Sequence, residues 1–153
     1  MGGAIQGHAL VLSDVVTAFA GSSSSAKFSN GTGTSALFYR ESGITSDGTS
    51  LYVADSGNHM IRKIVIATGL VTTLAGQAGT YGFEDGIGTK ARFTGPHGIV
   101  TDGTNVFVAD TFNQTIRKIV ITTGVVTTIA GIPGVLRVRL RLLTLLPPQS
   151  FID

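Results

Sequence analysis

The stretch that decides the fold is LYVADSGNHMIRKI at residues 51–64, because nearly the same string, VFVADTFNQTIRKI, returns at residues 106–119. Both copies keep Val-Ala-Asp, an Asn three residues later and then Ile-Arg-Lys-Ile. A reaction needs its catalytic residues once, whereas a string that recurs at a fixed spacing indicates an architectural repeat.

The repeat extends well beyond this string. A shift of 55 residues places residues 43–76 over residues 98–131 without a gap, and 22 of the 34 aligned positions are identical. The same shift places VVTAFAG at 15–21 over LVTTLAG at 70–76. A fixed period of this size is typical of solenoids, propellers and arrays.

One period predicts four strands joined by short turns. β-Branched and apolar runs alternate with turn dipeptides such as Asp47-Gly48, and short turns predict antiparallel neighbours. The expected strands are residues 43–46, 51–55, 60–66 and 70–75. The Gly-rich connection at 76–97 repeats its apolar residues, so we expect it to pack against the strands rather than to be a solvated linker.

Four antiparallel strands and a long connection, repeated, predict an all-β fold of β-propeller blades that stack face to face. Residues 1–131 hold about two and a half periods, whereas a closed propeller has ~4–8 blades, so we expect an incomplete propeller. Such a stack needs further blades or self-association to cover its ends. The expected divisions are a partial blade with its connection at 1–42, blades at 43–97 and 98–131, and a non-repeat tail at 132–153.

The pattern GI-x-x-DG-x-x-LYVAD-x-x-N-x-x-IRKI, with F-x-x-P-x-GI before it, resembles the NHL repeat over about residues 16–131. The second copy has the complete pattern with Pro96, whereas the first has Glu41 at that position. The segments DGIGTKARF and TGVVTTIAG resemble the long-blade bacterial members. This resemblance implies a six-bladed propeller or a similar ring, used mostly for binding, and allows an extracytoplasmic location.

Charge and composition exclude several classes of partner and site. Residues 1–131 carry eight basic and eight acidic side chains, so the net charge of +2 comes from the tail and gives little support for nucleic acid. The absence of Cys excludes disulfides and thiolate metal sites. No apolar run is long enough for a transmembrane helix. Asp14 interrupts the first apolar run and no basic residue precedes Lys27, so no convincing signal peptide is present.

The tail, IPGVLRVRLRLLTLLPPQSFID at 132–153, has none of the landmarks of the connection. It fits a strand, an amphipathic membrane-surface segment or an Arg-rich nucleic-acid arm, and we favour an end that does not belong to the family pattern over all three.

The polar residues that recur in the repeat are predicted to stabilise its turns, because Asp and Asn side chains bond to nearby backbone amides. These are Asp55, Asn58, Asp110 and Asn113.

Three chemical alternatives are weaker. His59 and His97 can share a face, as in a metal-dependent NHL-type lyase, but two His without a third ligand predict neither a metal nor a cofactor. Arg62-Lys63, repeated at 117–118, permits an RNA-binding propeller, but a solvated blade edge paired with acidic residues explains it better. The acidic pair Glu84-Asp85 reads as a solvated loop.

Function is expected in the loops, where the two copies differ. Phe112 replaces Gly57, His59 replaces Gln114, and residues 22–27 differ from residues 77–82. We therefore predict a non-enzymatic scaffold that binds a protein or a small ligand through its loop face, of which the sequence leaves the identity open. The predicted binding residues are Tyr81, Phe112, His59 and His97.

Overall fold

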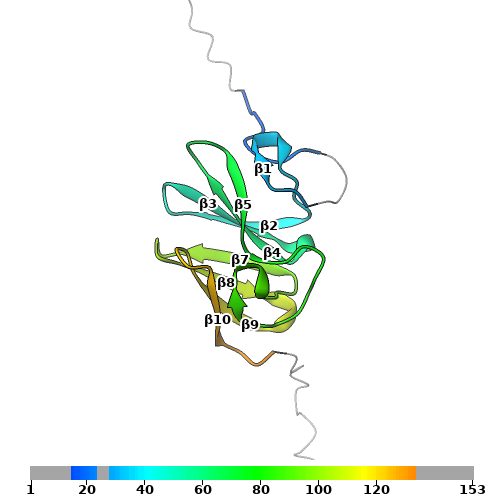
Figure 1. The fold of residues 1–153 in the computed structure, drawn as a ribbon, viewed down its shortest axis with the longest axis vertical. Coiled ribbons are helices and arrows are strands. Elements are labelled where there is room, and N and C mark those ends of the chain that lie inside the picture. Colours follow the sequence, from blue (N-terminus) through cyan, green and yellow to red (C-terminus); the bar gives the residue numbers. More distant parts are fainter. Residues whose placement is uncertain (1–14, 24–27, 134–153) are drawn as a thin grey trace, which may run out of the picture.

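The computed structural model describes residues 15–23 and 28–133, and within them it confirms an all-β fold built from two stacked antiparallel sheets (Figure 1). Blade 1 has the strand order β1-β5-β4-β3-β2, and blade 2 has the order β6-β10-β9-β8-β7. The strands of blade 1 are β1 (Gly31–Thr32), β2 (Glu41–Ser46), β3 (Ser50–Asp55), β4 (Met60–Val65) and β5 (Leu70–Gly76). Those of blade 2 are β6 (Gly86–Ile87), β7 (Pro96–Thr101), β8 (Asn105–Asp110), β9 (Thr115–Val120) and β10 (Val125–Ala130).

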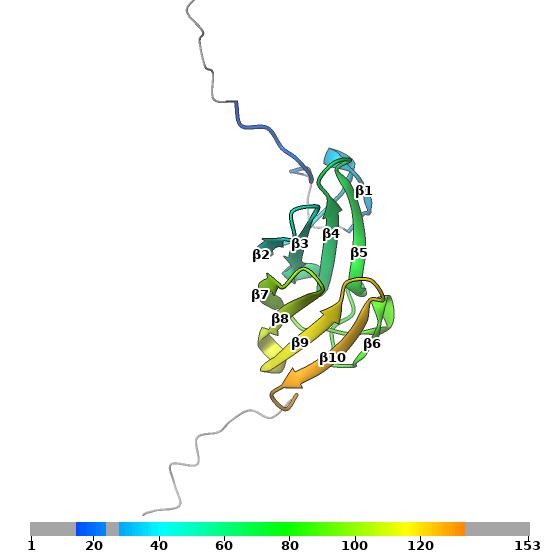
Figure 2. The same ribbon diagram turned by 90° about the vertical axis from the view of Figure 1, so that its left-hand side faces the viewer.

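Short 3-10 helices mark equivalent places in both copies. They are η1 (Gly33–Ser35), η2 (Ser56–Asn58), η3 (Gly88–Lys90) and η4 (Thr111–Asn113). η2 and η4 join the second and third long strands of each blade, and each is followed by a residue in the left-handed region, His59 or Gln114. β2 and β7 lie along one side of the stack, and β1 and β6 along the other (Figure 2).

Each sheet has five strands rather than the four that the sequence predicts. The additional strand is a two-residue segment of the long connection, which folds back onto the last long strand of the next blade. In blade 1, Gly31 pairs with Val71 and Thr32 with Leu70. The connection thereby covers an otherwise open sheet edge. Its repeated apolar residues have a different role, because Ala36 and Phe38 pack in one buried cluster and Ala91 and Phe93 in the other.

Residues 15–21, expected to be the last strand of an earlier blade, form no strand in the described part of the chain. Ala20 nevertheless packs against blade 1, at the place that corresponds to Ala75 in the contact between the blades. The segment lacks a ladder because the strand that would pair with it is absent from the described residues. The predicted tail at 132–153 lies, from residue 134 on, outside the described residues.

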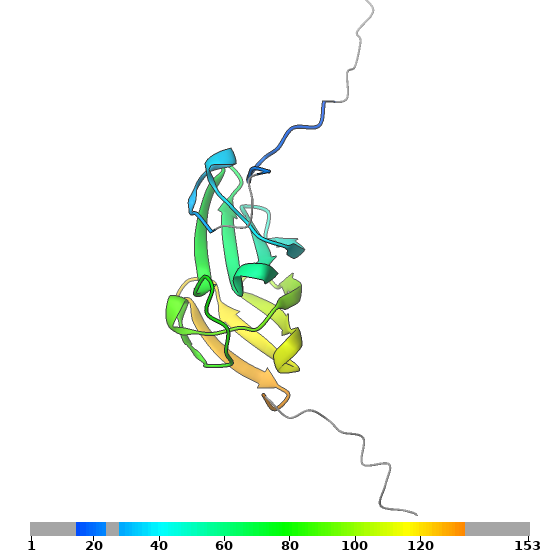
Figure 3. The ribbon, with the colours of Figure 1, turned by 90° about the vertical axis from the view of Figure 1, so that its right-hand side faces the viewer.

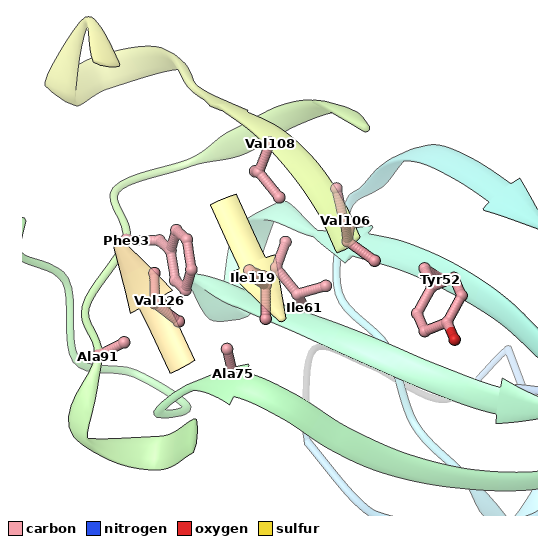
Figure 4. Packing of buried hydrophobic residues seen from close by; sticks show 10 residues of the cluster. Tyr52, Ile61, Ala75, Ala91, Phe93, Val106, Val108, Ile119 and Val126 are labelled. Carbon is pink, nitrogen blue, oxygen red and sulfur yellow. The ribbon is translucent and has the colours of Figure 1, made fainter. Parts of the chain in front are cut away.

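Blade 1 and blade 2 pack against each other through non-equivalent faces of their sheets (Figure 4). Blade 1 contributes Tyr52, Ala54, Ile61 and Ala75. Blade 2 and the connection before it contribute Ala91, Phe93, Val106, Val108, Ile119 and Val126. Removing these apolar side chains from water stabilises the stack by about 25 cal/mol for each Å² of apolar area buried.

A buried arginine fastens the connection to each blade. Arg117 is fully buried, and its guanidinium donates to Asp110 Oδ2 at 2.9 Å, Asp85 Oδ1 at 2.7 Å and the carbonyl oxygens of Arg92 and Glu84, both at 2.9 Å. The guanidinium also lies 5.0 Å from the ring centroid of Phe93, within reach of a cation–π attraction. One side chain therefore joins the strands to three points of the connection.

Blade 1 repeats this arrangement with small changes. Arg62 is fully buried and donates to Asp55 at 3.0 Å, to Asn30 Oδ1 at 2.9 Å and to two backbone carbonyls. Its guanidinium lies 4.8 and 4.9 Å from the ring centroids of Phe28 and Phe38. Burial lowers the pKa of Arg62, against the opposing effect of Asp55.

The predicted pairing of Arg62 and Arg117 with acidic residues is confirmed, but the predicted solvation of both arginines is wrong, because both are fully buried. The Asp85 side chain is 47% exposed, as expected of a solvated loop, but it also has partners inside the blade. The Asp85 carboxylate binds Arg117 and accepts hydrogen bonds from Thr128, and these bonds lower its pKa although burial acts to raise it. Both arginines look like surface residues in the sequence because the carbonyl groups that enclose them lie 25 or more positions away, in the connection.

Replacement of Arg117 by Ala should lower the free energy of unfolding by about 3–5 kcal/mol, because it leaves a buried carboxylate without its charged partner. Urea unfolding followed by circular dichroism measures the change. Lys118→Ala, one residue away and half-buried, is the matched control and should change stability by less than about 0.5 kcal/mol. Equal effects of the two substitutions would contradict the assigned role of Arg117.

The first turn of blade 1 depends on Asp47, which accepts hydrogen bonds from the amides of Thr49 and Ser50 at 2.8 Å. Its other oxygen accepts the hydroxyl of buried Tyr52, also at 2.8 Å. The Thr49 amide, and then the Tyr52 hydroxyl, lower the pKa of Asp47. Burial, and then the bond to Asp47, raise the pKa of Tyr52 to about 12.

The substitution Tyr52→Phe tests this coupling by pH. A carboxyl group whose pKa is lowered on folding stabilises the protein above its ordinary pKa of 3.8, and this stabilisation is lost as the pH falls through the lowered value. Tyr52→Phe should lower the free energy of unfolding at neutral pH and reduce its fall between about pH 5 and about pH 2. Urea titrations at both pH values measure this, with exposed Tyr81→Phe as control. An unchanged fall would show that Tyr52 does not stabilise the Asp47 carboxylate.

Candidate functional site

The predicted turn residues lie where the connection meets the strands. Asn58 donates to both carboxylate oxygens of Asp55, and Asp55 also accepts the amide of Tyr39 from the connection at 2.8 Å. Asn113 and Asp110 repeat this contact. Burial raises the pKa of Asp110, against the opposing hydrogen bonds from Asn113, the Thr94 amide and Arg117. These residues are buried, so they support the loops from below and are not themselves available to a ligand.

Above this support, the structure brings together the four residues predicted to bind a partner. We call Tyr81, His59, Gly95, His97 and Phe112 the loop cluster. His59 and Tyr81 lie with ring centroids 5.9 Å apart, and His97 and Phe112 with centroids 6.2 Å apart, both edge to face. Figure 3 shows the connection, residues 77–95, as it crosses blade 2 toward β7.

Gly95 links the two halves of the loop cluster. Its amide donates to His59 Nδ1 at 3.1 Å, and its carbonyl oxygen accepts from His97 Nδ1 at 2.8 Å. An amide can only donate and a carbonyl can only accept, so the two rings hold opposite tautomers when neutral. His59 then carries its proton on Nε2, whereas His97 leaves Nε2 free as an acceptor. The loop cluster thus offers one ring donor and one ring acceptor.

The aromatic rings of the loop cluster are open to solvent. Tyr81 is 72% exposed and Phe112 is 69% exposed, which places them among the most exposed large apolar side chains of the described residues. Phe112 packs closely over Gly95, which has a φ of 56° and leaves no room for a Cβ beside the ring. The ring of Phe112 therefore has a fixed base and a free outer surface.

Sequence reasoning missed Tyr39 and Arg40, which form the equivalent contact in blade 1. There the aromatic ring belongs to the connection and the glycine to η2: Tyr39 packs over Gly57, where blade 2 has Thr94 and Phe112. Arg40, at a φ of 54°, lies 5.1 Å from the Tyr39 ring centroid. The sequence signal that marks this pair is a double difference between the copies, Tyr39 against Thr94 and Gly57 against Phe112.

Within residues 15–23 and 28–133, no group of three or more His, Cys, Asp or Glu residues is placed to hold a metal ion. No helix in these same ranges is long and apolar enough to cross a membrane. Of the variable segment 22–27, residues 24–27 lie outside the described residues.

Sequence comparison with known proteins identifies relatives of this chain. No protein-family model matches the chain. A curated relative, NHL repeat-containing protein 2 of Gallus gallus, is 34% identical over 96 residues, which are 63% of this chain and 13% of that protein. The chain is homologous to NHL repeat-containing proteins. It spans about an eighth of the length of this relative.

Solved structures agree with a propeller-like fold. A Bacteroides thetaiotaomicron protein of unknown function matches 65% of this chain and 26% of its own, with 32% identity and a TM-score of 0.58. An auxiliary nutrient binding protein from the same organism matches 57% of this chain and 25% of its own, with 25% identity and a TM-score of 0.52. Each NHL-type repeat of this chain corresponds to the four long strands of one blade.

In both NHL-type blades, the shared Asp, Asn and Arg residues are buried, and the differences at positions 57, 59, 112 and 114 lie in the loops. The shared Asp, Asn and Arg bond to one another and to the connection, whereas Tyr81 and Phe112 have no aromatic equivalent in the other copy. The repeat therefore builds the platform, and the differences between repeats supply its surface.

The substitution Gly95→Ala should displace Phe112 and disturb both His contacts, because a Cβ at this position would overlap the Phe112 ring. A residue other than glycine at this positive φ also costs about 1 kcal/mol or more. Aromatic and imidazole NMR resonances report the displacement. Lys90→Ala, which lies in η3 and outside the loop cluster, is the control. Unchanged resonances of Phe112 and His97 in Gly95→Ala would contradict the contact.

Proposed function

We propose that the chain is part of a propeller-type binding scaffold and that its ligand, a protein segment or a small molecule, binds at the loop cluster. The observation that carries this proposal is the exposure of Tyr81 and Phe112 above a rigid, buried support. Exposed aromatic rings held in place provide a large contact area at a small entropic cost, and they dominate the binding energy of many interfaces. The named binding role of the nutrient-binding neighbour supports the same class of function.

The imidazole rings of His59 and His97 require that a ligand also carry polar groups. In the neutral tautomers set by Gly95, His59 presents an N–H donor and His97 presents an acceptor. A fitting ligand therefore has a flat apolar part for the rings, an acceptor group near His59 and a donor group near His97. Peptide amides and sugar hydroxyls both supply donors and acceptors at short spacing.

A non-catalytic role fits the site better than chemistry. His59 Nδ1 is occupied by the Gly95 amide, and the carboxylates at the ends of β3 and β8 are buried against arginines. An RNA-binding role loses its main support, because Arg62 and Arg117 are enclosed by their own blades. Neither arginine can reach a phosphate without loss of its partners.

The test is a selection for ligands followed by affinity measurements on variants. A displayed library of random peptides and a panel of soluble mono- and disaccharides serve as probes for the two ligand sources. We expect at least one arm to yield a ligand whose affinity falls about tenfold or more in Tyr81→Ala and in Phe112→Ala, as for aromatic anchors elsewhere. Isothermal titration calorimetry measures the affinities, and circular dichroism confirms that each variant stays folded.

Ile87→Ala is the matched control, because Ile87 is also exposed but lies on the edge strand β6, away from the loop cluster. This substitution should leave the affinity unchanged. The proposal fails if neither probe set yields a ligand, or if the selected ligands bind equally to the Tyr81 and Phe112 variants. Loss of binding in the Ile87 variant as well would place the ligand elsewhere on the chain.

A further inference from the structure

Within the described residues, the stack of two blades ends in two outer faces that no further blade covers, and the two faces differ in composition. The leading face is the outer face of blade 1, and it carries Leu51, Val53, Ile64 and Val71 with Phe38 of the connection. The trailing face is the outer face of blade 2. It carries Phe107, Ala109, Ile116 and Ala130, which follow Tyr52, Ala54, Ile61 and Ala75 of blade 1 by 55 positions.

The contact between the blades shows what these two faces fit. Blade 1 presents Tyr52, Ala54, Ile61 and Ala75 to blade 2, which are the equivalents of the trailing face. Blade 2 receives them on Val106, Val108, Ile119 and Val126, which are the equivalents of the leading face. We propose that the trailing face binds the leading face of a second copy of this chain, head to tail, through the same contact that joins blade 1 to blade 2.

Gly98, a glycine that the contacts among the described residues do not require, supports this second copy. At Gly43 a Cβ would lie 2.4 Å from the carbonyl oxygen of His97 and 3.1 Å from Ile99 Cγ2, so blade 2 requires glycine there. Gly98 is its equivalent in blade 2, yet a Cβ at Gly98 would meet Ala109 Cβ at 3.5 Å, an ordinary contact. A docked copy would bring its own Ser42 and Ile44, the equivalents of His97 and Ile99, against Gly98.

The leading face is also shaped as a receptor. It contains a hollow of about 370 Å³, lined by Glu41, Ser42 and apolar residues that include Ile44, Leu51 and Val53. Ile44 is 62% exposed, whereas its equivalent Ile99 packs against the contact between the blades. The hollow is thus the place that a trailing face occupies in the internal contact.

Residues 15–21 occupy part of this place and match the strand that would replace them. Their sequence, VVTAFAG, agrees with VVTTIAG at 125–131 in five of seven positions. Ala20 packs on the leading face, but Val16 is 97% exposed, whereas its equivalents Val71 and Val126 are 0% and 1% exposed. Val53, Ile64 and Val71 are already buried, but Ile44 stays exposed, so the segment covers the leading face only in part. In the proposed contact, β10 of the docked copy displaces residues 15–21 and takes their position.

This contact is heterologous, so repeated docking generates a ring if the rotation closes. Closed propellers contain about 4–8 blades, and each copy brings two described blades, so the ring takes about two to four copies. The resulting assembly leaves no blade face exposed. It also sets the loop clusters of the copies around a common axis.

Sedimentation velocity on the 153-residue chain tests the proposal through two substitutions on opposite sides of the proposed contact. Gly98→Ala adds a methyl group where the second copy would approach, and Ile44→Asp places a charge on the leading face. The unaltered chain should sediment as a discrete multiple of the chain mass. Each variant should lose that species at the same concentration, while urea unfolding shows that both variants stay folded.

Mixing the two variants gives the decisive measurement. The Gly98→Ala copy keeps an intact leading face, and the Ile44→Asp copy keeps an intact trailing face. Only a head-to-tail contact allows the mixture to form a dimer of one copy of each, capped at both ends. Ile87→Ala, outside both faces, should assemble like the unaltered chain. A single-chain mass for the unaltered protein, assembly that survives Gly98→Ala, or a mixture that stays single would each overturn the proposal.

Discussion

The buried pairing of an arginine with an aspartate in each blade is the interaction on which the remaining structure depends. Arg117 and Asp110 have no exposed side-chain surface, so water does not stabilise their charges. The stabilisation comes from each other, from the hydrogen bonds around them and, for Arg117, from Asp85 and the Phe93 ring. The cost of removing both charges from water is recovered because the guanidinium also binds carbonyl groups of the connection. A connection with many glycines is thereby fixed in one path over the blade.

The fixed connection determines both the edge and the face of each blade. Its short strands, β1 and β6, pair with the last long strand, and its Phe and Ala residues complete the packing between the blades. The charged core and the apolar contact thus depend on each other, since Phe93 contacts Arg117 and also lies in the interface of the blades. Loss of either one would release the loops that carry the exposed aromatic rings.

The same geometry separates support from recognition. The shared Asp, Asn and Arg residues are buried beneath the loops, and Tyr81 and Phe112, which have no aromatic equivalent in the other copy, are displayed above them. His59 and His97 are exceptional in that one backbone residue, Gly95, orders both rings and assigns them opposite hydrogen-bonding roles. This is a surface suited to a ligand with mixed polarity, on a scaffold whose faces are suited to more blades.

The sequence by itself determined the strands, the period and the repeated faces, because β-branched runs, turn dipeptides and a constant spacing are local properties of the chain. It also predicted the loop cluster, since differences between two otherwise similar copies can be read without a structure. Only the tertiary structure decided that Arg62 and Arg117 are buried, that the connection supplies a fifth strand, and that Tyr39 takes the place of Phe112 in blade 1. Each of these depends on contacts between residues far apart in the chain, and the energy of such contacts exists only after the blades have brought those residues together.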